Sequence, residues 1–341
     1  MKALTLTAYK EFQFGETSVP SLKPDEVLIK VAACGSDVHG MDGSTGRRLP
    51  PIIMGHEAAG TIHSAGPEAG SWTPGQRVTF DSTLYCGKCH YCADGQVNLC
   101  EDRRVLGVSC PDYRQHGAFA EYVAVPARVV IPIPDAVTFQ QACFVEPTAV
   151  ALHAVSRAQA GPGQTGLVIG AGIIGLLTIQ ALKAAGCTKV YASDLSEARL
   201  ALARELGADE VFPAKTTASL KDEMLARTNG QGVDIAMEAV GITATATAAI
   251  ESVRKGGHVG LIGNLAQKIE FPLQLVVTRE ITLFGSCASA GEYPQALQEI
   301  AAGRIRVEPL TSAIRPLSEG AGWFQRLYDA KEDLIKVILQ P

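Results

Sequence analysis

Residues 167–175 read Leu-Val-Ile-Gly-Ala-Gly-Ile-Ile-Gly, and this stretch decides the fold of the second half of the chain. An apolar strand over 165–170 runs into the pattern G-x-G-x-x-G and then into an expected helix over 173–185. Gly170 permits the tight turn, Gly172 lets the backbone approach a pyrophosphate, and Gly175 lets the helix pack on the strand. The phosphates would lie at the positive end of that helix. The stretch therefore predicts a dinucleotide-binding unit.

An acidic residue follows at the spacing that such a unit needs. Asp194 ends the next expected strand, nineteen residues after Gly175. Its carboxylate is expected to accept hydrogen bonds from the adenosine ribose, and its charge would repel a 2′-phosphate. This favours NAD over NADP as the cofactor. Arg199 leaves an alternative open, because it could hold a 2′-phosphate or stack on adenine.

From this stretch onward strands and helices alternate, which is typical of a doubly wound parallel sheet. The chain has 341 residues, enough for two domains. The expected strands are 165–170, 189–193, 233–237, 258–262 and 281–284, and the expected helices are 173–185 and 197–206.

The first third instead shows short alternating runs separated by Gly and Pro, which predicts an antiparallel sheet or partial barrel. Its expected strands are 26–31, 58–63, 76–80 and 119–125; a helix over 141–160, interrupted by Pro147, follows. After Gly285 a helix over 293–302 and a strand over 335–339 are expected, and the last strand can pair back onto the first domain. We therefore expect an α/β protein with a discontinuous β-rich domain, residues 1–152 and 290–341, and a dinucleotide-binding domain, residues 153–289.

Composition excludes several classes of function. The net charge is −5, so the chain lacks the basic surface that nucleic acid or an anionic membrane requires. No run of about eighteen apolar residues is present to span a bilayer, and residues 1–11 do not resemble a signal peptide. Nine cysteines, an odd count, favour a reducing compartment. We expect a cytoplasmic protein.

Four cysteines lie in one short segment. Cys86, Cys89, Cys92 and Cys100 are separated by two, two and seven residues. Four thiolates can close a tetrahedral shell around one zinc ion, which leaves no open coordination position. This predicts a structural zinc site, so a catalytic metal must bind elsewhere.

Other residues could form that second site. Cys34 follows an expected strand, His56 and Glu57 follow a Pro-rich loop, and Glu146 opens the expected central helix. One thiolate, one imidazole and one or two carboxylates can hold zinc and leave a position for substrate. Taken singly, such residues are more often structural than metal ligands, because a lone cysteine at a strand end usually lies in the core and a lone His-Glu pair usually lies on the surface.

Together these segments resemble the zinc-dependent medium-chain dehydrogenase/reductases, over the whole chain and in the same order. The motifs are residues 34–39 (Cys-Gly-Ser-Asp-Val-His), residues 55–60 (Gly-His-Glu-Ala-Ala-Gly), the four-cysteine segment, Glu146-Pro147 and residues 170–175. A glutamate directly after the histidine, and Glu-Pro at the central helix, point to the sorbitol (polyol) and threonine dehydrogenase branch.

The resemblance implies a GroES-like catalytic domain and a Rossmann domain. It implies that Cys34, His56 and either Glu57 or Glu146 hold a catalytic zinc, with Asp37 orienting His56. It also implies that Ser36 accepts the substrate proton and passes it toward His39. The residues expected to line the cofactor are Gly170, Gly172, Ile173, Ile174, Gly175, Asp194, Arg199, Val240, Leu261, Ile262, Gly263, Ser286 and Cys287.

The expected reaction is a reversible hydride transfer between NAD and a secondary alcohol, most simply a polyol or sugar alcohol that becomes a ketone or ketose. Sorbitol-specific members carry an arginine where this chain reads Gly-Ser-Cys-Ala-Ser, residues 285–289, which weakens sorbitol itself. A threonine 3-dehydrogenase-like reaction or a polyol phosphate, with Arg47-Arg48 or Arg103-Arg104 at the phosphate, remains an alternative. A non-catalytic nucleotide-binding protein is a more remote one. By resemblance, a homodimer or homotetramer is expected.

Overall fold

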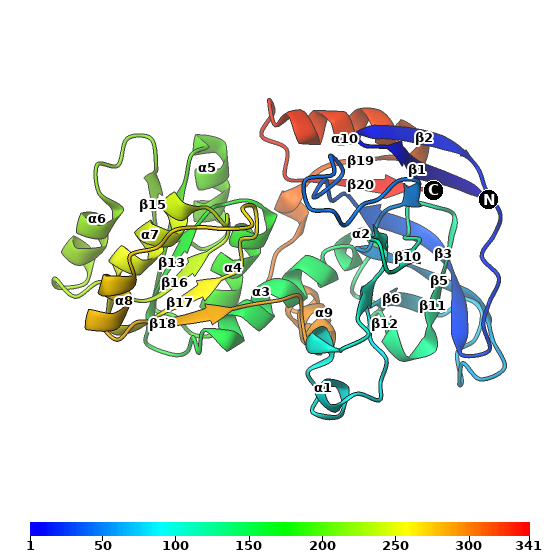
Figure 1. The fold of residues 1–341 in the computed structure, drawn as a ribbon, viewed down its shortest axis with the longest axis horizontal. Helices are drawn as coiled ribbons and strands as arrows, with labels where there is room; N and C mark the ends of the chain where they lie inside the picture. Colours follow the sequence, from blue (N-terminus) through cyan, green and yellow to red (C-terminus); the bar gives the residue numbers. More distant parts are fainter. The chain divides into compact units, whose positions relative to one another are not determined.

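The computed structural model describes residues 1–341, and the chain divides into two compact units. The β-rich unit comprises Met1–Glu146, Tyr293–Ala301 and Val307–Pro341, and the parallel-sheet unit comprises Pro147–Glu292 and Ala302–Arg306. Figure 1 colours both along the sequence. The predicted domain boundaries, 152–153 and 289–290, remain a prediction.

The parallel-sheet unit is built on a six-stranded, wholly parallel sheet. In spatial order its strands are β15 (Glu210–Pro213), β14 (Lys189–Asp194), β13 (Thr165–Ile169), β16 (Val233–Glu238), β17 (Val253–Leu261) and β18 (Thr282–Gly285). The chain winds outward in one direction from β13 and then in the other from β16. The edge formed by the carboxyl ends of these two strands is where ligands bind in sheets of this kind.

Within this unit a helix follows each of these strands except β18: α4 (Ile173–Ala184), α5 (Glu197–Glu205), α6 (Leu220–Arg227), α7 (Thr243–Ser252) and α8 (Leu273–Thr278). Another helix, α3 (Val145–Arg157), precedes β13. The strands read as continuous apolar runs because both faces of the sheet are covered. Leu167, Val233 and Val259 are fully buried in the core between sheet and helices. The predicted doubly wound parallel sheet is confirmed.

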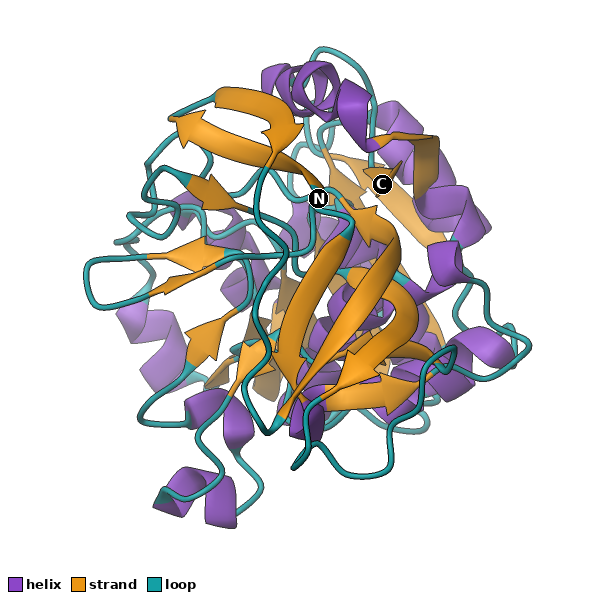
Figure 2. Ribbon diagram, turned by 90° about the vertical axis from the view of Figure 1, so that its right-hand side faces the viewer, coloured by secondary structure: helices purple, strands orange, loops and turns teal.

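The β-rich unit contains a seven-stranded, mainly antiparallel sheet. Its spatial order is β12 (Val130–Pro132), β6 (Arg77–Phe80), β5 (Ala58–Ala65), β3 (Glu26–Gly35), β20 (Lys336–Gln340) and β19 (Thr311–Pro316), with β11 (Tyr122–Pro126) also paired to β3. The longer, curved strands of the β-rich unit face the viewer in Figure 2.

Smaller elements complete this unit. A three-stranded sheet contains β2 (Glu11–Glu16), β1 (Lys2–Ala8) and β4 (Ile52–Ile53); two ribbons pair β7 (Thr83–Leu84) with β8 (Arg104–Val105) and β9 (Val108–Ser109) with β10 (Arg114–Gln115). The helices are α1 (His90–Ala93), α2 (Phe139–Ala142), α9 (Tyr293–Ala301) and α10 (Gly320–Asp329). None of the helices in the chain is both long and apolar enough to cross a membrane.

The C-terminal strand returns to the N-terminal part of the chain, as predicted. In the antiparallel pairing of β20 with β3, Leu339 lies opposite Cys34 and Ile338 opposite Gly35. Residues more than 300 positions apart in sequence thus become neighbours at the end of β3.

Several predicted elements have different bounds in the structure: β3 continues to Gly35 instead of ending at 31, and β17 begins at Val253 instead of 258. The expected helix over 141–160 is two helices, because α2 ends at Ala142 and α3 begins at Val145. Proline lacks an N–H and fits only the first turn of a helix, so Pro147 requires a new helix to start just before it. The expected strand over 119–125 begins only at Tyr122.

Candidate metal centre and cofactor site

Three predicted ligands lie together in the β-rich unit. The ligand atoms of His56, Glu57 and Glu146 all lie within 4.8 Å of one another. His56 and Glu57 precede β5, and Glu146 lies in the first turn of α3. Ligand atoms at zinc are about 2.0–2.2 Å from the ion, so a group of this size can surround one.

The charges in this group fit a divalent cation. Burial lowers the pKa of His56 to about 4, although Asp37 opposes the shift, so the imidazole is neutral and able to bind a metal. Burial first, and then the neighbouring Glu57, raises the pKa of Glu146 to about 8. Two buried carboxyl groups that resist ionisation together are stabilised as carboxylates when a dication lies between them.

Asp37 lies beside His56 but at a long distance. Its Oδ2 atom is 3.9 Å from His56 Nε2, beyond hydrogen-bond range, and 3.3 Å from Arg48 Nη2. Burial alone would raise the pKa of Asp37, but His56 and Arg48 together lower it below its usual value. Its predicted role in orienting His56 remains a prediction. Arg48 is itself buried and was missed as a partner of this carboxylate.

Cys34 is fully buried at the end of β3 and is not part of the three-residue group. Burial, followed by the proximity of Cys143, raises the pKa of its thiol. A Cβ atom added to Gly55 would lie 2.9 Å from the sulfur, so Cys34 packs directly against the segment that carries His56. The participation of Cys34 in the metal site remains a prediction.

The side chain of Lys336, on β20, was not predicted as part of the site. Its Nζ atom lies 2.7 Å from Glu57 Oε1 and 2.5 Å from Glu57 Oε2, and both side chains are almost completely buried. Burial lowers the pKa of a lysine, but Glu57 more than offsets this effect and raises the pKa of Lys336. A lysine within the apolar run Ile335-Lys-Val-Ile-Leu was the sequence signal available.

Glu146 has a different environment. Its Oε1 atom receives a long hydrogen bond of 3.4 Å from the hydroxyl of Ser82, whose backbone N–H donates to the Tyr293 hydroxyl at 3.1 Å. No motif marked Ser82 or Tyr293, because their importance comes only from the proximity of β6, α3 and α9. Glu146 is thus held by a neutral donor, whereas Glu57 is held by a cation.

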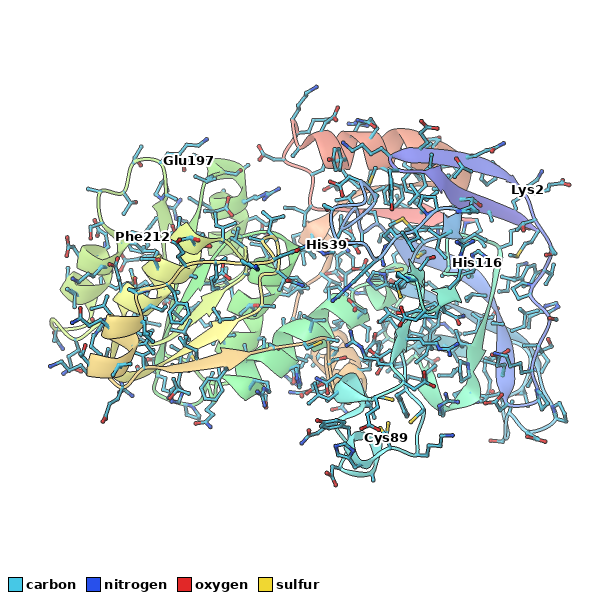
Figure 3. All side chains as sticks on the ribbon, in the orientation of Figure 1. Lys2, His39, Cys89, His116, Glu197 and Phe212 are labelled. Atoms are coloured by element: carbon cyan, nitrogen blue, oxygen red, sulfur yellow. The ribbon has the colours of Figure 1, made fainter.

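The two residues of the expected proton relay lie on the loop after β3. Ser36 is buried, and its Oγ atom accepts a 3.0 Å hydrogen bond from the backbone N–H of Val337, which leaves its hydroxyl proton free to be donated. The side chain of His39 is exposed, and its backbone N–H donates to Asp37 at 2.9 Å. Figure 3 labels His39 on this loop.

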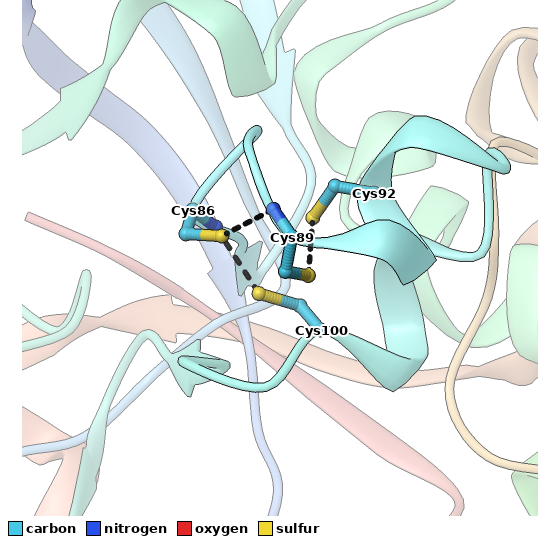
Figure 4. Close-up of side chains that lie close together, drawn as sticks. All are labelled: Cys86, Cys89, Cys92 and Cys100. Carbon is cyan, nitrogen blue, oxygen red and sulfur yellow. Dashed lines mark hydrogen bonds between the residues drawn. The ribbon is translucent and has the colours of Figure 1, made fainter.

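The four cysteines of the predicted structural site converge (Figure 4). The sulfur atoms of Cys89 and Cys92 are 3.5 Å apart, near the edge of about 3.8 Å expected for a tetrahedron with zinc–sulfur bonds of about 2.3 Å. The backbone N–H groups of Lys88 and Cys89 each donate to Cys86 Sγ at 3.4 Å, and that of Cys86 donates to Cys100 Sγ at 3.2 Å. Such donors favour thiolates, the form that binds zinc.

The glycine-rich turn has the geometry that a pyrophosphate needs. Gly170 has a φ of +95°, and a Cβ at Gly175 would lie 1.7 Å from the Gly170 carbonyl oxygen, so both positions require glycine. A Cβ at Gly172 would instead meet nothing within 4 Å. Gly172 is also the N-cap of α4, with no side chain capping the helix. The open space and the free N–H groups fit a bound anion.

Asp194 lies at the end of β14 beside this turn. Its Oδ2 atom accepts a hydrogen bond from Ala171 N at 2.6 Å and its Oδ1 atom one from Ser196 N at 2.8 Å. The Nε atom of Arg199, on α5, is buried without a hydrogen-bond partner. The contact of either residue with a ribose or a 2′-phosphate remains a prediction.

The remaining predicted cofactor residues lie at the carboxyl end of the same sheet. Val240 follows β16, and the N–H groups of Ile262 and Gly263, after β17, donate to the Glu238 carbonyl. Ser286 follows β18; its N–H donates to Leu261 O, and its buried hydroxyl has no partner. Cys287 is exposed. Their contact with a cofactor remains a prediction.

Three of the four arginines considered for a phosphate are engaged in other contacts. Arg48 faces Asp37, and Arg47 is exposed. Arg103 donates to Asn98 O at 3.2 Å, and Arg104 pairs with Asp102 at 3.8 Å. These contacts give neither pair the character of a preformed phosphate site.

Comparisons with known proteins agree with this arrangement. Residues 23–135 match the alcohol dehydrogenase GroES-like domain, and residues 174–302 match the zinc-binding dehydrogenase family. Sorbitol dehydrogenase of Bacillus subtilis is 33% identical over 349 residues, covering 100% of this chain and 97% of that protein.

Two solved structures have the same fold. Alcohol dehydrogenase TADH from Thermus sp. ATN1 has a TM-score of 0.93 and 30% identity, with 100% of this chain and 99% of that chain covered. A protein from Sinorhizobium meliloti, described as a zinc-binding dehydrogenase bound to NADP, has a TM-score of 0.91 and 31% identity, again covering 100% and 99%.

The chain belongs to the zinc-dependent medium-chain dehydrogenase/reductase family, as its motifs predicted. Within that family it lies in the polyol dehydrogenase branch, and it is an enzyme of the alcohol dehydrogenase type. The predicted fold class, a GroES-like domain and a Rossmann domain, is confirmed.

Proposed function

We propose that the protein is an NAD-dependent dehydrogenase that oxidises a secondary hydroxyl of a polyol or sugar alcohol to the ketone or ketose. The observation that carries the proposal is the group formed by His56, Glu57 and Glu146, whose ligand atoms lie within 4.8 Å. The sorbitol dehydrogenase to which the chain is similar supports a polyol as the substrate class.

The proposal includes two zinc ions in each chain. Cys86, Cys89, Cys92 and Cys100 would hold a structural ion, and His56 with a carboxylate, Glu57 or Glu146, and Cys34 would hold the catalytic one. When bound, the catalytic ion supplies Lewis acidity that lowers the pKa of the substrate hydroxyl.

The chain itself provides proton transfer. Ser36 is buried with a free hydroxyl proton, and His39, three residues later, is exposed to solvent. A buried hydroxyl and an exposed imidazole can pass a proton outward, because an imidazole titrates near neutral pH. We assign the acceptor role to Ser36 and the exchange with solvent to His39.

NAD is the favoured cofactor because Asp194 places a negative charge where NADP carries its 2′-phosphate. Arg199 and the NADP-bound relative from Sinorhizobium meliloti are the observations that favour NADP. A direct comparison of the two cofactors belongs in the first assay.

A neutral substrate fits better than a phosphorylated one. The buried charge of Arg48 is balanced by Asp37, and residues 285–289 contain no arginine. Threonine and polyol phosphates remain the second candidates, because the same chemistry acts on any secondary hydroxyl.

Assembly into a homo-oligomer is also proposed. The outer edge of β18 pairs with no strand, and Leu273 and Val277 on the adjacent α8 are 62% and 64% exposed. Unpaired edges beside apolar side chains are commonly covered by a second copy. Light scattering on the purified protein gives the assembly mass directly.

The deciding experiment follows NADH formation with pentitols, hexitols, secondary diols, threonine and polyol phosphates, and repeats each with NADP. Turnover on a polyol that chelation abolishes and zinc restores supports the proposal. Turnover only on threonine or a phosphate would redirect it to the second candidates. No turnover on any alcohol, from protein that contains both zinc ions, would contradict it.

A further inference from the structure

The buried lysine on β20 donates hydrogen bonds to one carboxylate and to one backbone carbonyl. Lys336 Nζ donates to both oxygens of Glu57, and to the backbone carbonyl of Ser36 at 2.9 Å. An ammonium group has three protons, so all of them are used within the β-rich unit. The side chains of Lys336 and Glu57 are only 3% and 6% exposed, so water does not weaken this pair.

The pair is also enclosed sterically. A Cβ added to Gly35 would lie 2.5 Å from Glu57 Oε2 and 3.3 Å from Lys336 Cδ. The backbone of β3 therefore leaves just enough room for the carboxylate and the lysine stem. Glu57 cannot turn away from Lys336 without losing both of its charge-assisted hydrogen bonds.

Glu146 differs in each of these respects. Its Oε1 atom accepts a hydrogen bond from the neutral Ser82 hydroxyl, at the long distance of 3.4 Å. It is nevertheless in the same group of ligand atoms as Glu57 and His56. Of the two carboxylates in this group, only Glu57 is hydrogen-bonded to a cation.

We propose that Lys336 is a positioning residue that holds Glu57 off the catalytic metal, so that Glu146 serves as the carboxylate ligand and the position Glu57 could fill stays open for the substrate hydroxyl. This inference rests on the proposed function. In this proposal Lys336, which is remote in sequence, determines which of the two glutamates, Glu57 or Glu146, binds the metal.

The test removes the lysine and then the carboxylate that it restrains. In K336M, Glu57 competes with substrate for the open position, so the competent fraction of enzyme falls. If that fraction falls to about one tenth, KM for the alcohol rises about tenfold while kcat changes little. In K336M/E57Q the competitor is gone, and KM returns to within about threefold of the wild type. K30M, which removes the exposed Lys30 from β3, is the matched control.

Metal binding gives a second readout that requires no substrate. Glu57 adds a ligand in K336M, so zinc is lost to a chelator about tenfold more slowly than from the wild type, and the visible spectrum of the cobalt-substituted enzyme changes. Both effects disappear in K336M/E57Q. In E57Q alone the cobalt spectrum matches the wild type, because Glu57 does not bind the metal in the resting enzyme.

Several results would overturn the proposal. One is a folded K336M with wild-type KM and cobalt spectrum, and another is a rise in KM that E57Q does not reverse. Should K336M fail to fold, the E57Q spectrum decides, since a change there shows that Glu57 is already a ligand. If the protein oxidises none of the alcohols, the KM comparison cannot be made, but the cobalt spectrum and the rate of zinc loss still test the role of Lys336. Failure of the proposed function and failure of this assignment are therefore distinguishable.

Discussion

The Oδ2 atom of Asp194 accepts a 2.6 Å hydrogen bond from the backbone N–H of Ala171, inside the glycine-rich turn. The residue expected to bind the ribose therefore also fixes the turn expected to bind the pyrophosphate. We expect D194A to raise KM for NAD at least tenfold while lowering that for NADP, because the repelling charge is removed. The unfolding free energy should fall by about 1–3 kcal/mol, since two backbone donors lose their acceptor.

Steady-state kinetics with both cofactors and urea titration measure these effects. D194N is the control, because it keeps an acceptor for the turn but loses the charge. A D194A enzyme with unaltered preference would show that Asp194 acts only on the turn.

The two glycines flanking Ile173 and Ile174 should respond differently to alanine. G172A should fold normally, because the added Cβ meets nothing within 4 Å, yet bind NAD at least tenfold more weakly because the methyl group fills the space of the phosphates. G175A should be destabilised by about 1–3 kcal/mol or more, because its Cβ would lie 1.7 Å from a carbonyl oxygen. Thermal denaturation and calorimetric titration with NAD distinguish the two effects. Equal cofactor affinity in G172A and wild type would argue against phosphate binding at this turn.

The four-cysteine segment should hold one zinc ion independently of the catalytic centre. C89S is expected to reduce the zinc content by one ion per chain, because one thiolate of the tetrahedral set is lost. C110S changes a cysteine outside the set and should retain all the zinc. Elemental analysis of the dialysed proteins provides the measurement. Full zinc content in C89S would contradict a four-thiolate site.

Removal of metal should make stability depend on pH between 6.5 and 8. The folded pKa of Glu146 is raised to about 8, above its unfolded value, so the stabilising protonated form is lost as the pH rises through this range. The unfolding free energy of the metal-free protein should fall by about 1 kcal/mol per pH unit. His56 affects stability at lower pH. Its pKa is depressed to about 4, so its contribution to the unfolding free energy is lost only as the pH falls below about 6.5.

Zinc should remove the dependence assigned to Glu146, since the bound ion keeps the carboxylate ionised. Urea denaturation at pH 6.5 and 8, with chelator or with zinc, measures it. E146Q without metal is the control and should show a smaller slope. A flat profile in chelator would mean that Glu146 is already ionised without metal.

Local patterns predicted most of the fold. The parallel sheet followed from apolar runs such as β13 and from the glycine spacing, which encode strand, turn and helix within ten residues. The break between α2 and α3 was missed because a four-residue helix followed closely by a thirteen-residue helix produces nearly the same apolar pattern as one long helix.

Part of the candidate site could also be predicted, because several of its residues stand in local sequence motifs. His56, Glu57 and the cysteine segment stand in short motifs, and Glu146 precedes a proline that marks a helix start. Lys336, Arg48, Ser82 and Tyr293 carry no such mark. Each becomes significant only through tertiary pairing, as when β20 lies against β3, and that pairing is not encoded in local spacing.

The pairing of Glu57 with Lys336 joins positions 279 residues apart, which sets an order of events during protein synthesis. At about 5–20 residues per second, a ribosome needs roughly 15–55 s to add the intervening residues after it has placed Glu57. During that interval the nascent first half carries a carboxylate whose counter-ion has not been translated. With the role proposed for Lys336, the metal centre would mature only when the final strand emerges. A message cut short before codon 336 would yield a polypeptide with every proposed zinc ligand but an unrestrained Glu57.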